Sequence, residues 1–268
     1  MEENKENEIQ KYLEREPIHV LVYGESGSKK STFAATFPKP ILVFFFEALG
    51  KDQPYLRAGK ISSPRIYEGP YPIREIYNEK GELVIRIEYF RDPDPLQPLA
   101  YSLFLSRFAQ IKRAIFNPNL VPNEPKWQTI VFDSVTDMEL AIRKNAQYRL
   151  NPTAKDARQW FGESTNQIEE VLMLSVGSIP INVVTVCHID EDKDEVGGFM
   201  VRNPAFPGRL KKRSAGSYSE FYRAGVKTTE KGERVWYLQT ESDSLFNAAS
   251  QILAPNGCSP DYNALWRG

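Results

Sequence analysis

The residues best suited to chemistry form one short loop near the start of the chain: Gly24, Glu25, Ser26, Gly27, Ser28, Lys29, Lys30, Ser31 and Thr32. Their spacing matches the phosphate-binding pattern G-x-x-x-x-G-K-[ST] at every defined position but one. In such loops the backbone N–H groups and the N-terminus of the next helix point at phosphate oxygens. The Lys30 ammonium would reach the β- and γ-phosphates, and the Ser31 hydroxyl would bind Mg²⁺. The alternative is a glycine- and serine-rich turn without a ligand.

Lys29 is the one departure from this pattern, because it stands where the pattern has its second glycine. Glycine serves at such a position either for its backbone angle or for a close approach to phosphate. The lysine side chain could point outward and add positive charge, or it could distort the loop and weaken binding. The sequence leaves both possibilities open.

Asp133 is the second candidate, near the end of the apolar run WQTIVFDSV (127–135). A carboxylate at the carboxyl end of a buried parallel strand would lie beside the phosphate loop, at the crevice of the sheet. There it would hold Mg²⁺ through water, as in a Walker B strand. Aspartate is also a common helix N-cap, and DSVTDM fits a helix start.

The elements that must position these residues are strands alternating with helices. Strands are predicted for the apolar runs at 18–24, 41–47, 127–135 and 181–190. Helices are predicted after the phosphate loop, at 99–116, after Asp133, at 158–177 and near LFNAASQIL, and two further, antiparallel strands for SEFYRAGVKTT and RVWYLQTE. Because each central strand is apolar throughout, we expect an α/β fold with a mainly parallel sheet and helices on both faces.

The chain reads as one domain, 17–268, preceded by a polar and flexible arm, 1–16. An insertion at about 50–98 is rich in proline, tyrosine and charge. Its residues alternate on both sides of the sequence Asn-Glu-Lys-Gly, which predicts a β-hairpin with Gly81 at the positive-φ position of the turn.

Composition excludes several classes of protein. Hydrophobic residues make up 41% and charged residues 26%, as in ordinary soluble proteins. No apolar run is long enough to cross a bilayer, and the acidic N-terminus fits neither a signal nor a transit peptide, so a cytoplasmic location is expected. Cys187 lies in an apolar run and reads as a buried, reduced thiol. With a net charge of -1, any contact with nucleic acid would need local basic clusters.

In chain order, the phosphate loop, its short helix, PILVFFFE, IVFDS and VVTVCHI resemble the core of RecA. The likeness is closest to phage-encoded RecA-like ATPases of single-strand annealing and recombination. It covers about 17–255, and the insertion matches poorly. The resemblance implies ATP and Mg²⁺ as ligands. It makes Glu47 the residue that activates the attacking water, and His188 the sensor of the γ-phosphate where RecA has glutamine. Alternatively, both are ordinary polar residues at strand ends.

In that family, loops after the aspartate strand and the sensor strand contact single-stranded DNA, which points here to about 143–162 and about 190–216. Basic side chains would follow the phosphate backbone and aromatic ones would stack on bases. The candidates include Arg158 and Trp160 in the first loop and Arg202, Arg209, Lys211, Lys212 and Arg213 in the second. The resemblance also implies that Lys211, Lys212 or Arg213 acts across a subunit interface. Acidic residues open the second loop, so a solvated charged loop is the alternative.

The function expected from these features is ATP-dependent binding of single-stranded DNA in recombination or annealing, in a self-associated form. One alternative is a nucleotide-binding switch or scaffold with little hydrolysis. Another is a RecA-fold translocase that closes into a ring. Filament and ring are not distinguished by the sequence.

Overall fold

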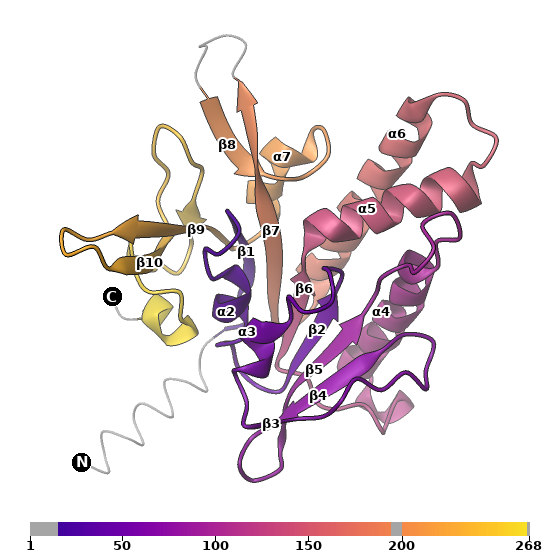
Figure 1. Cartoon of the computed structure of the whole chain (residues 1–268), viewed down its shortest axis with the longest axis horizontal. Helices are drawn as coiled ribbons and strands as arrows, with labels where there is room; N and C mark the ends of the chain where they lie inside the picture. Colours follow the sequence, from indigo (N-terminus) through magenta and orange to yellow (C-terminus); the bar gives the residue numbers. More distant parts are fainter. Residues whose placement is uncertain (1–15, 194–199, 267–268) are drawn as a thin grey trace.

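The computed structural model describes residues 16–193 and 200–266 (Figure 1). The strands are β1 (His19–Gly24), β2 (Ile41–Phe45), β3 (Ile61–Ser62), β4 (Ile73–Tyr77), β5 (Leu83–Tyr89), β6 (Thr129–Asp133), β7 (Asn182–Lys193), β8 (Met200–Pro204), β9 (Glu220–Thr228), β10 (Arg234–Gln239) and β11 (Ala249–Ser250). The α-helices are α2 (Lys30–Ala34), α3 (Gln53–Leu56), α4 (Ala100–Phe116), α5 (Val135–Asn145), α6 (Ala157–Ile168) and α7 (Leu210–Arg213).

The strands form one sheet in the order β10-β9-β1-β7-β6-β2-β5-β4-β3. From β9 to β5 every neighbouring pair is parallel, whereas β10, β4 and β3 are antiparallel to their neighbours. The predicted α/β fold with a mainly parallel sheet is therefore confirmed. Of the two C-terminal strands, β10 is antiparallel as expected, but β9 also runs parallel to β1 and so belongs to the central sheet.

The register of the parallel strands positions the candidate site. Gly24 at the end of β1 pairs with His188 on β7, and Phe45 on β2 pairs with Asp133 on β6. Parallel strands end at the same edge of the sheet. Asp133 ends β6 at this edge, and the phosphate loop and Glu47 come directly after β1 and β2 there.

Both faces of the sheet are covered, as predicted. Along β2, Leu42 and Phe44 point into one apolar cluster, and the alternate residues point into a second one. Helices α4 and α5 pack on the first cluster, where the rings of Phe44 and Phe104 lie 5.2 Å apart. On the opposite face lie α2, α3 and a 3-10 segment, Tyr262–Trp266. A strand that is buried on both faces needs the continuous apolar runs seen in this sequence.

The insertion contains the predicted β-hairpin, β4 and β5, with Gly81 at a φ of 76°. Its second strand also pairs in parallel with β2, so the hairpin widens the central sheet. The carboxylate of Asp52, which is fully buried, accepts hydrogen bonds from Tyr89 at 2.5 Å and from Arg65 at 3.2 Å. This cluster ties the insertion to the segment that follows Glu47.

Three local predictions were wrong. The segment 143–162 is mostly helical, because α5 continues through Ala146–Leu150 and α6 begins at Ala157. The segment 190–216 is not a loop throughout, since β7 runs on to Lys193 and pairs with β8. No helix forms near LFNAASQIL. Instead, the Glu220 carboxylate accepts the backbone N–H groups of Gln251 and Ile252, both at 3.1 Å, and β11 pairs with β9.

Other predictions concern single features. Cys187 is a free, fully buried thiol, as expected. Within the described ranges, no helix has the length and apolar character needed to span a membrane. The predicted arm, 1–16, falls outside the described residues except for Glu16, so it stays a prediction.

Arg107 on α4 provides a test of how the core is held together. Its buried guanidinium donates hydrogen bonds to Glu88 on β5, at 2.8 Å and longer, and to Glu124, at 2.8 Å. We expect Arg107→Ala to lower the free energy of unfolding by about 3–5 kcal/mol, because it leaves the buried carboxylate of Glu88 without its cation and takes one of two cations from Glu124. Urea denaturation measures this. Arg113→Ala, an exposed residue of the same helix, is the control, and equal stability of the two variants would contradict the expectation.

Candidate functional site

The phosphate loop turns sharply between β1 and α2. An added Cβ at Gly24 would lie 2.3 Å from the carbonyl oxygen of Ala224 on β9, so no larger residue fits there. Lys30 is the first residue of α2 and is buried. Its ammonium donates hydrogen bonds to the carbonyls of Gly24 and Glu25, both at 2.8 Å. Burial lowers the pKa of Lys30, an effect partly opposed by Asp133 and other acidic groups.

Lys29 keeps the backbone shape that glycine would give the loop. Its φ of 67° and ψ of 26° lie in the left-handed region, which costs a residue with a side chain roughly 1–2 kcal/mol. The side chain points at β10, where its ammonium lies 3.6 Å from the ring centroid of Trp236. Trp236 also donates a hydrogen bond from Nε1 to the Gly27 carbonyl at 2.9 Å. The loop is therefore not distorted by Lys29, and contacts from β10 support its shape.

Asp133 lies fully buried at the end of β6. Its Oδ2 accepts a hydrogen bond from the Tyr55 hydroxyl at 2.6 Å, whereas Oδ1 makes none with any described residue. Burial, reinforced by Glu47, raises the pKa of Asp133 to about 6, against the opposing effects of Tyr55, Ser31 and Lys30. A buried carboxylate oxygen without a partner, next to the Ser31 hydroxyl, is a donor set that fits Mg²⁺.

The alternative role of Asp133 as a helix cap is wrong. The residue that caps α5 is Ser134, whose side chain accepts a hydrogen bond from the Asp137 backbone N–H at 3.3 Å. The Asp133 carboxylate therefore takes no part in capping α5.

Ionisation of the Asp133 side chain should lower the free energy of unfolding. Because its pKa is raised, the folded chain holds more protons than the unfolded chain between about pH 4 and 6, so the free energy of unfolding falls as pH rises through this window. At pH 7 we expect Asp133→Asn to be more stable by on the order of 1–3 kcal/mol. The gain should shrink at pH 4.5. Urea denaturation at both pH values measures it, and an Asn variant less stable than wild type at pH 7 would contradict it.

Glu47 and His188 are brought together beside the loop. Glu47 follows β2 and is 9% exposed. It forms an ion pair with Lys51 Nζ at 3.0 Å, and His188 Nε2 lies 3.2 Å from its other carboxylate oxygen. Burial raises the pKa of Glu47, but the hydrogen bonds from His188 and Lys51 outweigh it, and the net shift is downward. Glu47 is therefore ionised near neutral pH. The backbone N–H of His188 donates to the Thr136 hydroxyl at 3.1 Å, which anchors this end of β7 to α5.

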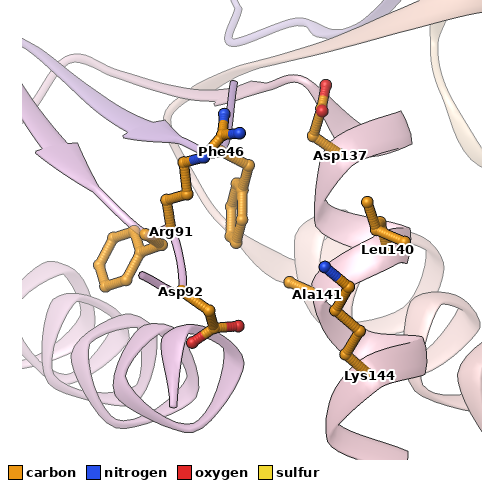
Figure 2. Close-up of a pocket in the computed structure, with 8 residues that line it drawn as sticks. Phe46, Arg91, Asp92, Asp137, Leu140, Ala141 and Lys144 are labelled. Carbon is orange, nitrogen blue, oxygen red and sulfur yellow. The ribbon is translucent and has the colours of Figure 1, made fainter. Parts of the chain in front are cut away.

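These groups surround one cavity of about 280 Å³. Its lining is mostly polar and comprises Ser26, Gly27, Lys29, Lys30, Ser31, Thr32, Glu47, Lys51, Pro54 and His188. A smaller cavity of about 80 Å³ lies between α5 and the end of β5 (Figure 2). Figure 2 shows the α5 residues Asp137, Leu140, Ala141 and Lys144 on one side of it and Phe46, Arg91 and Asp92 on the other. Acidic and basic side chains both line this smaller cavity, and none of them belongs to the phosphate loop.

Four residues that shape the site were missed by sequence reasoning. Tyr55 and Lys51 come from the insertion and contact Asp133 and Glu47. Trp236 comes from the far end of the chain. Asp137 has a carboxylate oxygen within 4.8 Å of ligand atoms of Glu47 and His188. Of these, only Asp137 could have been singled out from the sequence, because it lies with Asp133 in the segment DSVTDM, where a helix is predicted to begin.

The basic candidates lie elsewhere and are engaged with acidic residues. Arg209 and Arg213 both pair with Glu169 at 2.8 Å, and Lys211 pairs with Asp190 at 2.5 Å. Arg158 pairs with its neighbour Asp156. The side chain of Lys212 lies outside the described part of the structure. Among the described residues, none of these candidates lines the 280 Å³ cavity.

Comparison with known proteins places the site in a family. The sequence model of a family described as an AAA domain matches residues 16–246. No curated protein matches the chain. Two solved structures are similar to it, each at 10% identity. The flagellar accessory protein FlaH from Methanocaldococcus jannaschii has a TM-score of 0.38, with 91% of this chain and 88% of FlaH covered. The Legionella pneumophila ATPase DotB has a TM-score of 0.31, with 87% of this chain and 47% of DotB covered. The match over 16–246, which includes the phosphate loop, Glu47, Asp133 and His188, shows that the chain belongs to the AAA-domain family of P-loop ATPases.

Proposed function

We propose that this protein binds ATP with Mg²⁺ in the 280 Å³ cavity and hydrolyses it to ADP and phosphate. The observation that carries the proposal is the convergence of Lys30, Ser31 and Glu47 on one polar cavity, with Asp133 buried beside them. Loop N–H groups and the Lys30 ammonium would bind the triphosphate, for which Lys30 would leave the carbonyls that it now contacts. Ser31 and Asp133 would hold Mg²⁺, which neutralises charge on the phosphates.

Glu47 would orient and polarise the attacking water as a general base. Because Glu47 is ionised and held by His188 and Lys51, its carboxylate is fixed in direction in the lining of the same cavity. His188 would respond to the γ-phosphate through its contact with Glu47.

One observation favours a second candidate, a nucleotide-binding switch with little hydrolysis. Hydrogen bonds from His188 and Lys51 lower the pKa of Glu47, and a carboxylate with a lowered pKa accepts a proton less readily. In this case ATP would be held and not turned over.

The identity of the recovered nucleotide separates the two. Protein is incubated with ATP and Mg²⁺, freed of unbound nucleotide by gel filtration, and denatured, and the released nucleotide is identified by chromatography. Hydrolysis predicts ADP. A switch predicts unchanged ATP. If no nucleotide is recovered, even by a method that traps slowly exchanging ligand, both candidates are contradicted.

We further propose that single-stranded DNA is the partner and that the working form is self-associated, in recombination or annealing. The connection between α5 and α6 supports this. The connection presents the exposed Lys155, and the first turns of α6 present Arg158, which is exposed, and Phe161, which is 46% exposed. Exposed basic and aromatic side chains together suit a phosphate backbone with unpaired bases. In Figure 1 this helical pair and the β7–β8 hairpin both project beyond the central sheet.

The test is ATP turnover at several protein concentrations with and without an oligothymidine strand. Turnover that rises with DNA and with protein concentration supports the proposal, and binding of the labelled strand should fall steeply with added salt. Arg158→Ala and Phe161→Ala should weaken DNA binding, whereas Lys60→Ala in the insertion should not. Electron microscopy then shows whether the assembly is a filament or a ring. Binding that does not depend on salt would contradict phosphate contacts.

A further inference from the structure

Trp236 on β10 makes two contacts with the phosphate loop that the binding of phosphate does not explain. Its indole N–H donates to the carbonyl of Gly27 at 2.9 Å, and one face of its ring carries the ammonium of Lys29, 3.6 Å from the ring centroid. The hydrogen bond holds the ring against the outside of the loop. The other contact shows that one ring face is covered by the Lys29 ammonium, which is the group that a ligand would have to displace.

The 280 Å³ cavity suits a triphosphate better than a whole nucleotide. Small-molecule sites usually span about 300–1,000 Å³ and are mostly apolar with aromatic walls. Eight of the ten residues that line this one are polar or charged, and the described residues that line it include no phenylalanine, tyrosine or tryptophan. A base joined to a triphosphate in this cavity therefore needs a surface just outside it. Trp236 contacts two of the lining residues, Gly27 and Lys29.

We propose that the ring of Trp236 is the platform on which the base of the bound nucleoside triphosphate stacks. This inference rests on the proposed nucleotide-binding function. A ring face that binds an ammonium also accepts the flat π-face of a base. The base takes the place of the Lys29 ammonium, and Lys29, which already lines the cavity, turns toward the triphosphate. The exchange places a second cation beside the phosphates, where opposite charge is favourable.

The hydrogen bond from Trp236 to the loop gives the platform its orientation. Because the ring is held before the ligand binds, little side-chain freedom remains to be lost on binding. Stacking depends on the face of the base and not on its edge, so it adds affinity for a nucleoside triphosphate and none for inorganic tripolyphosphate.

The experiment compares the dissociation constants of ATP and inorganic tripolyphosphate, both with Mg²⁺, by isothermal titration calorimetry. We expect Trp236→Ala to weaken ATP binding by about 5-fold to 100-fold, the range for loss of one base stack, with tripolyphosphate binding changed much less. Trp236→Phe keeps an aromatic face but loses the N–H donor, and should retain most of the preference for ATP. Val235→Ala, the neighbour on β10, is the control and should change neither constant.

Three results would overturn the inference. If Trp236→Ala weakens ATP and tripolyphosphate equally, Trp236 only supports the loop. If Lys29→Ala, which frees the ring face, lowers the preference for ATP over tripolyphosphate, then Lys29 and not the ring recognises the nucleoside. If wild-type protein binds neither ligand, the proposed nucleotide site itself fails, and this inference fails with it.

Discussion

Glu47→Gln is expected to slow ATP turnover by about 10²–10⁴-fold, the usual contribution of a general base, while leaving the affinity for ATP close to that of wild type. The substitution keeps the shape of the side chain and an oxygen for Lys51, but it removes the negative charge that polarises water. Glu47 lines the cavity but is not part of the phosphate loop. Turnover is therefore the property that should change.

The measurement is steady-state phosphate release, with ATP affinity determined on the same preparation. Glu79→Gln is the matched control, because Glu79 lies in the exposed turn of the β4–β5 hairpin and pairs only loosely with Lys60. Equal turnover in Glu47→Gln and wild type would remove Glu47 from the mechanism.

Lys30→Ala should abolish measurable nucleotide binding. Hydrogen bonds to charged groups contribute about 1.5–3 kcal/mol each, and the Lys30 ammonium is the cation enclosed by the loop itself. Its loss removes both the positive charge and the two-pronged contact that a triphosphate would receive. Affinity for ATP should fall at least about 100-fold, which calorimetry would register as no binding at moderate concentrations.

A folding defect must be separated from loss of the binding group. Thermal unfolding of Lys30→Ala should remain cooperative, because burying the ammonium is costly and its loss removes this cost together with two hydrogen bonds to backbone carbonyls. Lys60→Ala, with a side chain 68% exposed, controls for loss of a charge. Unchanged ATP affinity in a folded Lys30→Ala variant would mean that the loop is not the nucleotide site.

Much of the fold was predictable because its strands are local features. A buried parallel strand requires a continuous apolar run, and β1, β2, β6 and most of β7 are such runs. The polar residues that follow these strands must then meet at one edge of the sheet. The amino-acid sequence was therefore enough to place Glu47, Asp133 and His188 near the phosphate loop.

The rest depends on contacts between distant segments. The hydroxyl of Tyr55 meets Asp133 across 78 positions of sequence, and Trp236 reaches Gly27 across 209. Neither follows from local pattern or propensity. The strand β8 was missed for a related reason, because the acidic and polar residues of the β7–β8 hairpin lack the apolar alternation of a half-buried strand.

The role of Lys29 could be described only from the sequence and the structure together. The sequence identified the departure from glycine but could not say what it does. The structure shows the left-handed backbone and the contact of the ammonium with Trp236. A cation–π contact of this kind contributes about 0.5–1 kcal/mol at an exposed site, which offsets part of the backbone cost.

The most direct measurement is phosphate release from ATP by wild-type protein, with Mg²⁺ and again with EDTA in its place. A P-loop ATPase with Ser31 and Asp133 as the metal-binding side chains should release phosphate through many turnovers with Mg²⁺ and none above background with EDTA. Turnover that is equal in the two conditions, or absent in both while ATP binds tightly, would contradict hydrolysis at this site.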